Sequence, residues 1–200
     1  MKLLEKSLLL AFILTALISF TGFTAGCEDI PNHVLRLHVL ANSDTAEDQN
    51  LKLKVRDRIL AESAGLLDNA KDKEDAQQII KSKIPLLKEA AQDEVKKNGY
   101  NYPVNVEMAN MYFTTRKYDE VTLPAGDYDA LRVTIGKAEG HNWWCVVFPP
   151  MCLPAAEESK ELSDVLNSNQ LQIVKQTGDF EVKFKTVELY EELKSFINNR

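Results

Sequence analysis

The sequence predicts a single domain of the α+β class, in which a mostly antiparallel sheet packs against helices. Several short segments alternate apolar and polar residues with a period of two, as half-buried strands do. Longer segments repeat apolar residues every three or four positions, as amphipathic helices do. The 200 residues are 44% hydrophobic and 27% charged, which is the composition of a globular chain with a core.

The N-terminal segment, 1–26, has the layout of an export signal. Lys2 and Lys6 lead into the uncharged segment 8–20, and the small-residue string TGFTAGC follows. The apolar stretch is shorter than the roughly 20 residues that a membrane-spanning helix needs, which favours cleavage over a permanent anchor. We therefore expect a mature domain, 30–200, that works outside the cytoplasm.

Cys27 stands where a bacterial lipoprotein carries its acylated cysteine, because the small residues Ala25 and Gly26 precede it. Thr24 departs from this pattern, since such sites usually have Leu at that position. Two alternatives stay open: lipidation of Cys27 with a membrane tether through the N-terminus, or ordinary cleavage nearby. A single lipid chain would hold the protein only marginally to a membrane.

A strand, 33–40, and a helix open the domain. In the strand, apolar residues alternate with Arg36 and His38, which are therefore expected on the opposite face. The helix follows the string DTAE, 44–47, which has the form of a capping box with Asp as its first residue. An apolar residue at every fourth position then predicts that the helix continues to about Glu62.

A second helix is predicted from about Lys73 to Lys97, where an Asn-Gly pair ends it. Pro85 in its interior should kink or split this helix. From Val104 the period changes to two, which indicates antiparallel strands. Further strands are expected at 131–135, 142–148 and 180–184, and an amphipathic helix follows the last of them.

The string GHNWWCVVFPPMC, 140–152, concentrates residue types that serve catalysis, metal binding and disulfides. On one extended strand His141 and Cys145 would lie about 13 Å apart, too far for a nucleophile and its base. The spacing His-x3-Cys-x6-Cys also lacks the short ligand pairs of structural zinc sites, so no metal is expected. A disulfide between Cys145 and Cys152 fits an exported protein, and two buried free thiols are the alternative.

Trp143 and Trp144 are adjacent in this predicted strand, so they point to opposite faces. One tryptophan can therefore be exposed as a protein-binding residue, since Trp is strongly enriched at interaction hot spots. Alternatively, both faces of the strand are covered and both rings are buried.

Three segments resemble a known family. They are LRLHVLANSDTAEDQNLKLKVRDRIL (35–60), LPAGDYDALRVTIGKAEGHNWWCVVFPPMC (123–152) and FEVKFKTVEL (180–189). In the same order, these segments are similar to the stage II sporulation protein R family of endospore-forming bacteria. The strings HVLANSD and GHNWWCVVFPP are long and unusual in composition, which makes the likeness more specific than a short motif.

The resemblance implies a sporulation signal rather than an enzyme. Members are made in the forespore and exported into the space between the forespore and mother-cell membranes. There they activate a membrane-embedded aspartic protease that processes the precursor of sigma factor E. No cofactor is expected. A net charge of −6 gives no clustered positive face for nucleic acid, so that class of partner is excluded.

We expect the partner-binding surface where the two most recognisable strings meet. It comprises Arg36, His38, Asn42, Ser43, Asp44, His141, Asn142, Trp143 and Trp144. Two other classes stay open: a structural or adhesive envelope domain, and a hydrolase that uses Cys145 or Asp44 with a histidine. In the simplest alternative, Asp44 only caps a helix and the residues before it only shape a turn.

Overall fold

The computed structural model describes residues 3–118, 121–151, 161–175 and 184–191. The chain divides into two compact units, each assembled from separate parts of the sequence. Unit 1 comprises Met1–Pro31, Tyr112–Gly126 and Leu166–Arg200, and unit 2 comprises Asn32–Met111 and Asp127–Val165. The predicted limits of the export segment and the mature domain stay predictions.

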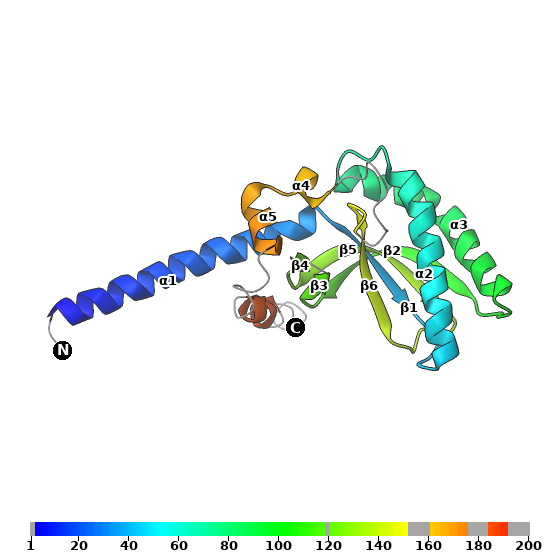
Figure 1. Cartoon of the computed structure of the whole chain (residues 1–200), viewed down its shortest axis with the longest axis horizontal. Coiled ribbons are helices and arrows are strands. Elements are labelled where there is room, and N and C mark those ends of the chain that lie inside the picture. Colours follow the sequence, from blue (N-terminus) through cyan, green and yellow to red (C-terminus); the bar gives the residue numbers. More distant parts are fainter. Residues whose placement is uncertain (1–2, 119–120, 152–160, 176–183, 192–200) are drawn as a thin grey trace. The chain divides into compact units, whose positions relative to one another are not determined.

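The main sheet lies mostly in unit 2 (Figure 1). In the described part of the chain its strands pair in the order β2-β5-β1-β6. They are β1 (Leu35–Leu40), β2 (Val104–Phe113), β5 (Gly126–Ile135) and β6 (Asn142–Phe148). The strand β1 is therefore internal, with β5 on one side and β6 on the other.

The sheet is mixed. Strand β1 runs antiparallel to β6, with Leu37 opposite Cys145, and parallel to β5, with Val39 opposite Val133. Strands β2 and β5 are antiparallel, because Asn110 contacts Asp129 while Glu107 contacts Arg132. The α+β class predicted from the sequence is confirmed, and the expected mostly antiparallel sheet contains one parallel pair. A period of two reports the two faces of a strand but not the direction of its neighbour, which depends on the long connection between β1 and β5.

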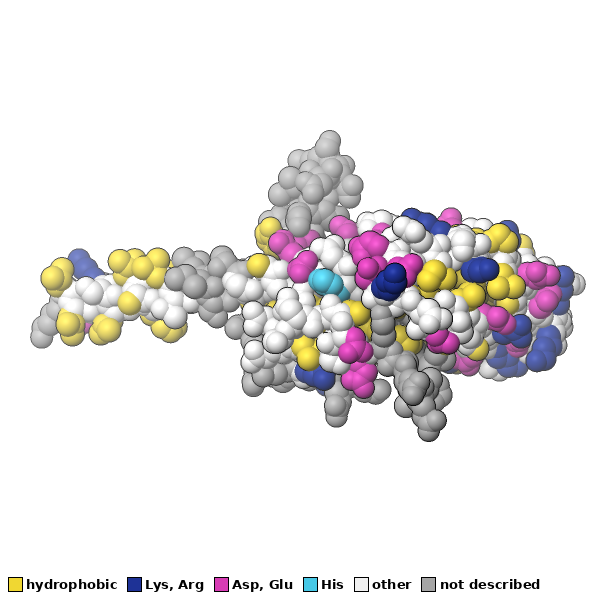
Figure 2. Space-filling view, turned by 90° about the horizontal axis from the view of Figure 1, so that it is seen from above, with side chains coloured by type: hydrophobic (Ala, Val, Ile, Leu, Met, Phe, Trp, Pro, Cys, Tyr) yellow, Lys and Arg dark blue, Asp and Glu magenta, His cyan; other side chains and the backbone are white. Residues whose placement is uncertain are grey.

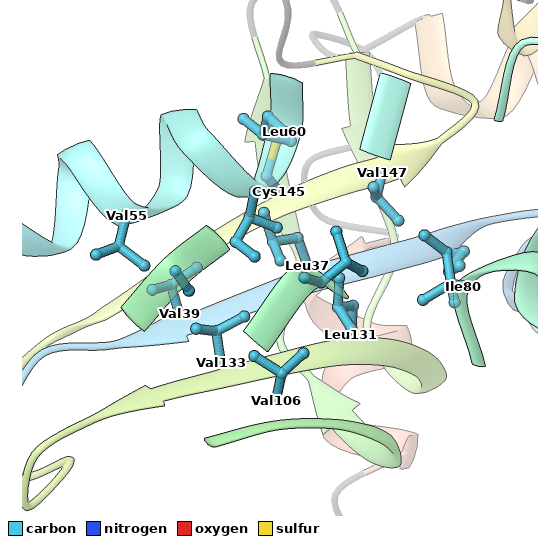
Figure 3. Close-up of a cluster of buried hydrophobic side chains, with 14 of the residues drawn as sticks. Leu37, Val39, Val55, Leu60, Ile80, Val106, Leu131, Val133, Cys145 and Val147 are labelled. Carbon is cyan, nitrogen blue, oxygen red and sulfur yellow. The ribbon is translucent and has the colours of Figure 1, made fainter. Parts of the chain in front are cut away.

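The helices α2 (Ala46–Leu67) and α3 (Lys73–Lys97) pack against each other and against β1. Their apolar residues meet those of the sheet in one core (Figure 3). From the helices come Val55, Leu60 and Ile80, and from the strands Leu37, Val39, Val106, Leu131, Val133, Cys145 and Val147. Burying one large apolar side chain stabilises the fold by about 1.5–3 kcal/mol. This layer is therefore the main stabilising contact of unit 2.

The first helix of unit 2 starts one residue later than the capping box predicted. Thr45, not Asp44, is the N-cap of α2, and its hydroxyl accepts a hydrogen bond from the backbone N–H of Asp48 at 3.3 Å. The helix also runs on to Leu67, beyond the expected end at Glu62. Asp44 therefore does not cap α2, and its carboxylate contacts His141 instead.

The second helix, α3, matches the predicted limits from Lys73 to Lys97. Asp72 caps its start by accepting a hydrogen bond from the backbone N–H of Asp75 at 2.8 Å. The prediction that Pro85 splits the helix is wrong, because α3 continues through it. Pro85 lies on the exposed side, where water can hydrogen-bond the backbone carbonyl that proline leaves without a donor.

Unit 1 contains the N-terminal helix α1 (Leu3–Asp29) and a second pair of strands. The remaining elements are η1 (Ile30–Asn32), β3 (Arg116–Tyr118), β4 (Val121–Leu123) and α5 (Ser168–Lys175), while the short helix α4 (Leu162–Val165) belongs to unit 2. Residues 184–191 are helical, so Phe184 does not end a strand as expected, and 180–183 lie outside the described residues. Among the helices that the structure describes, none is long and apolar enough to cross a membrane.

Replacing Pro85 with Ala should raise the free energy of unfolding by up to about 3 kcal/mol, since alanine restores a backbone donor inside α3. Urea denaturation of the two proteins measures the difference. The matched control is Lys83→Ala, an exposed change two residues away that should shift stability by less than about 0.5 kcal/mol. A Pro85→Ala protein no more stable than the control would contradict the prediction.

Candidate functional site

The pairing of β1 with β6 brings the two predicted surface segments together. In this antiparallel pair His38 lies opposite Trp144, and Leu40 lies opposite Asn142. The end of one strand therefore adjoins the beginning of the other. The loop after β1, with Asn42 to Asp44, consequently lies beside the residues that lead into β6.

Asp44 ties these two segments to each other. Its Oδ1 atom accepts a hydrogen bond from the backbone N–H of His141 at 2.6 Å, and it also contacts Nδ1 of the His141 ring. The backbone hydrogen bond is the main reason that the pKa of Asp44 lies below its ordinary value. The two side chains are 52% and 79% exposed, so this pair stands at the surface.

Lys52 on α2 is a buried residue that also connects these two segments. Its Nζ atom donates hydrogen bonds to the backbone carbonyl of His141 at 2.9 Å and to Oε1 of Gln49 at 2.5 Å. Gln49 in turn donates to the carbonyl of Ser43 at 2.9 Å. The side chain of Lys52 is buried, and this burial lowers its pKa. Both segments are thus hydrogen-bonded to the first turns of α2.

Asn42 and Ser43 hold the loop in shape. Asn42 Nδ2 donates to Asp48 Oδ2 at 2.8 Å, and Ser43 Oγ donates to the same oxygen at 2.5 Å. Burial acts to raise the pKa of Asp48, but these hydrogen bonds outweigh it and lower the pKa. Asn42 Oδ1 also accepts from the backbone N–H of Lys137 at 3.0 Å. These contacts agree with the simpler interpretation, in which the two residues shape a turn.

Gly136 and Gly140 allow the β5–β6 connection to approach this loop closely. Gly136 has a positive φ of 60°, and a Cβ atom there would lie 2.8 Å from Cγ of Asn42. Gly140 donates its backbone N–H to the carbonyl of Ala41 at 3.0 Å, and a Cβ atom there would lie 2.6 Å from the carbonyl carbon of Ser43. A side chain at Gly140 would therefore push two stretches of backbone apart.

The two tryptophans have different surroundings. Trp143 is 37% exposed, and the guanidinium of Arg56 lies over its ring at 4.3 Å from the centroid. Trp144 is half-buried and stacks on His38, with ring centroids 4.2 Å apart and an interplanar angle of 7°. The Nε2 atom of His38 also hydrogen-bonds Oδ1 of Asn142 at 2.8 Å.

The predicted surface residues fall into three groups by exposure. Asp44, His141, Asn142 and Trp143 are exposed, Asn42, Ser43 and Trp144 are half-buried, and Arg36 and His38 are buried. Arg36 is 0% exposed, with its guanidinium 4.7 Å from the centroid of the Tyr128 ring. The expectation that Arg36 and His38 form part of an accessible surface is corrected. Alternation places them on the face opposite Leu37, but that face is also covered.

The structure adds three residues that the sequence analysis did not select. Gln49, Lys52 and Arg56 lie on α2 and contact the loop or Trp143. Their spacing of three to four residues puts them on one side of the helix. This spacing is the only feature of the sequence that could have grouped the three residues. Helical spacing does not show which strand ends that side meets.

The two cysteines that the structure describes, Cys27 and Cys145, are both buried and do not support a nucleophilic role. Cys145 is 0% exposed inside the core cluster, where a substrate would not reach it. Cys152 lies outside the described residues, so its pairing with Cys145 stays a prediction. Asp44 and His141 do touch, but more than half of each side chain is exposed, and nothing there excludes water as a catalytic site does. In the described part of the chain no group of three metal-ligating side chains gathers.

Comparison with known proteins shows a matching family and a similar relative. A family model described as stage II sporulation protein R matches residues 31–158, which include the whole candidate surface. The stage II sporulation protein R of Bacillus subtilis (strain 168) is 39% identical over 123 residues. The aligned part covers 62% of this chain and 55% of that relative, so the match spans little more than half of the relative's length. No solved structure matches the chain.

Protein stability should fall on acidification because of His38. Burial is the main cause that lowers the pKa of His38 from its ordinary value of 6.5, followed by the opposing hydrogen bond to Asn142 and the nearby charge of Arg132. Below pH 6.5 the unfolded state therefore binds more protons at His38 than the folded state does. The free energy of unfolding should decrease from pH 6.5 toward about pH 5.

Urea denaturation of the wild type and of a His38→Phe variant at several pH values isolates this contribution. Phenylalanine keeps a flat ring against Trp144 but does not titrate, so the pH dependence should be shallower in the variant. Parallel pH profiles of the two proteins would show that His38 does not carry the effect.

A Gly140→Ala substitution should lower the free energy of unfolding by about 1–3 kcal/mol, because the new Cβ meets the backbone of Ser43, which cannot move aside. Gly65→Ala is the matched control: it lies in α2 with nothing within 4 Å of the added Cβ, and it should stabilise by up to about 1 kcal/mol. Thermal unfolding of both variants measures whether each substitution lowers or raises the stability. Equal stabilities would mean that the close approach at Gly140 is unimportant.

Proposed function

Because the chain belongs to the stage II sporulation protein R family, we propose that it is an exported signalling protein of sporulation. It activates a membrane-embedded aspartic protease, which then processes the precursor of sigma factor E. The N-terminal segment directs export, and the folded protein acts in the space between the forespore and mother-cell membranes. A tether to a membrane through the N-terminus is compatible with this location.

The observation that carries the proposal is the surface formed by Asp44, His141, Asn142 and Trp143, which we name the docking surface. These residues come from the two strings on which the family resemblance rests, and they are exposed side by side at one end of the sheet. A surface of this kind suits contact with another protein, since it combines an aromatic ring with polar groups.

The docking surface is also preorganised. Asp44 and Lys52 fix His141 through its backbone, and Arg56 holds the ring of Trp143 in place. Side chains that are already ordered lose less conformational entropy when a partner binds. Trp143 is the expected anchor, because tryptophan is the residue type most enriched among interface hot spots.

A binding role accounts for the site better than catalysis does. Cys145 is buried, and the Asp44–His141 pair is open to water. Neither arrangement provides a desolvated nucleophile with a base in reach. We therefore assign the pair to recognition: with Nδ1 of His141 directed at Asp44, its Nε2 atom is the one that a partner can reach.

Reconstitution of the protease with its sigma-factor precursor in lipid vesicles tests the proposal. Adding the purified full chain should start precursor cleavage, followed on a denaturing gel. No cleavage at any concentration of folded protein would show that the chain does not activate this protease. Cleavage without detectable binding between the chain and the protease would also reject the proposed direct contact.

Single substitutions locate the contact. Trp143→Ala and His141→Ala should each weaken binding by about 2 kcal/mol, which is roughly 30-fold in affinity. Leu86→Ala is the matched control, because Leu86 is 43% exposed on α3 and lies outside the docking surface. Thermal unfolding confirms that each variant is folded. Variants of both docking residues that bind and activate as the control does would place the contact elsewhere.

A further inference from the structure

The C-terminal part of α1 is built into the core of unit 1. Phe23 is 6% exposed, Cys27 is 1% exposed, and Ile30 in the following turn is 0% exposed. Their spacing of three to four residues puts them on one side of the chain as it leaves the helix. The sequence assigned Phe23 to a removable export segment, but in the fold its side chain is a core residue.

Three contacts bind this part of α1 to the C-terminal portion of unit 1. The rings of Phe23 and Phe184 meet edge to face, with centroids 5.4 Å apart. Asp29 Oδ2 accepts a hydrogen bond from Nε2 of Gln170 at 2.6 Å. Gly26 packs so closely against α5 that a Cβ atom there would lie 2.5 Å from Cδ1 of Ile173. An apolar contact, a hydrogen bond and a close approach of the Ile173 side chain to Gly26 thus all involve the segment 22–31.

The N-terminal part of α1 lacks such burial. Large apolar side chains project into solvent around it, as the yellow atoms of the N-terminal helix in Figure 2 show. They are Leu3, Leu4, Leu8, Leu9, Leu10, Phe12, Ile13 and Leu14, with exposures between 45% and 84%. The change from an exposed apolar helix to a packed one therefore falls between Leu14 and Phe23, and not after Gly26.

Cleavage directly before Cys27 would conflict with this packing. It would remove Phe23 and the close contact of Gly26, and it would leave a charged α-amino group on a residue whose side chain is 1% exposed. Burial of a new charge without a partner is unfavourable.

We propose that the segment 22–31 is retained in the exported protein as part of the folded unit 1, so that any removal of N-terminal residues ends before Gly22. The export function is then confined to the exposed apolar part of α1. The inference rests on the packing of unit 1 and on the export proposed above, but it does not depend on the proposed activation of a protease.

The reactivity of the Cys27 thiol depends on whether α1 is packed in unit 1. Burial is the main cause that raises the pKa of its thiol to about 12, with a smaller contribution from Glu28. A protonated and buried thiol reacts slowly with alkylating reagents. Attachment of a lipid to Cys27 would require α1 to leave its place in unit 1, so retention and lipidation at Cys27 exclude each other.

The mature N-terminus is the first test. The full chain is expressed in an endospore-forming bacterium, recovered from the extracytoplasmic fraction and analysed by intact mass and N-terminal sequencing. The expected protein starts at or before Gly22 and carries no lipid on Cys27. A protein that starts at Phe23 or beyond, with or without a lipid on Cys27, would overturn the proposal.

The second test follows Cys27 in the purified full chain. Maleimide labelling at Cys27, located by peptide mapping so that the other cysteines do not interfere, should be roughly 100-fold or more slower in the folded protein than in urea. Equal rates would show that α1 does not pack in unit 1 and would refute retention.

Two glycine substitutions provide a matched pair. Gly26→Leu should clash with Ile173 and accelerate labelling of Cys27 at least about 10-fold, because the segment is forced out of the core. Gly22→Leu, at an exposed position with nothing within 4 Å of an added Cβ, should leave the rate unchanged. Similar labelling of the two variants would contradict the packing on which the proposal depends.

Discussion

The pairing of β1 with β6 is the constraint on which the candidate site depends. Once Leu37 lies opposite Cys145, the antiparallel register places the end of β1 beside the start of β6. Asp44 can then reach the backbone of His141, although 97 positions separate them in the sequence. A shift by one residue would turn every side chain of β6 to the other face, removing Cys145 from the core. The hydrophobic core and the surface residues are thus fixed by one set of backbone hydrogen bonds.

Buried polar contacts turn this juxtaposition into a defined surface. Lys52 and Asp48 lie inside the first turns of α2, and each is satisfied by hydrogen bonds from or to the two loops. Removal of one member would leave a desolvated polar group without its partner, which costs more than an exposed hydrogen bond contributes. The loops are therefore held by buried groups, whereas the exposed ring of Trp143 lies against Arg56 at the surface.

Unit 1 shows how a segment with the composition of an export signal can also serve a folded core. Its residues come from the N-terminal, middle and C-terminal parts of the chain. Phe23 and Cys27 are as apolar as the residues before them, so hydropathy alone does not separate the two parts of α1. The difference lies in Ile173 and Phe184, whose side chains meet only the C-terminal part of the helix among the contacts that the structure describes.

The sequence by itself determined the main helices and strands of unit 2 and the family. Capping residues and apolar periods gave α3 its limits at Lys73 and Lys97, and alternation assigned Arg36 and Leu37 to opposite faces of β1. Only the tertiary structure decided what covers each face, and it buries Arg36, turns β5 parallel to β1 and tolerates Pro85 on an exposed side of α3. The reason is physical: periodicity depends on neighbours within one element, whereas burial, strand direction and the meeting of Asp44 with His141 depend on contacts between residues far apart in the chain.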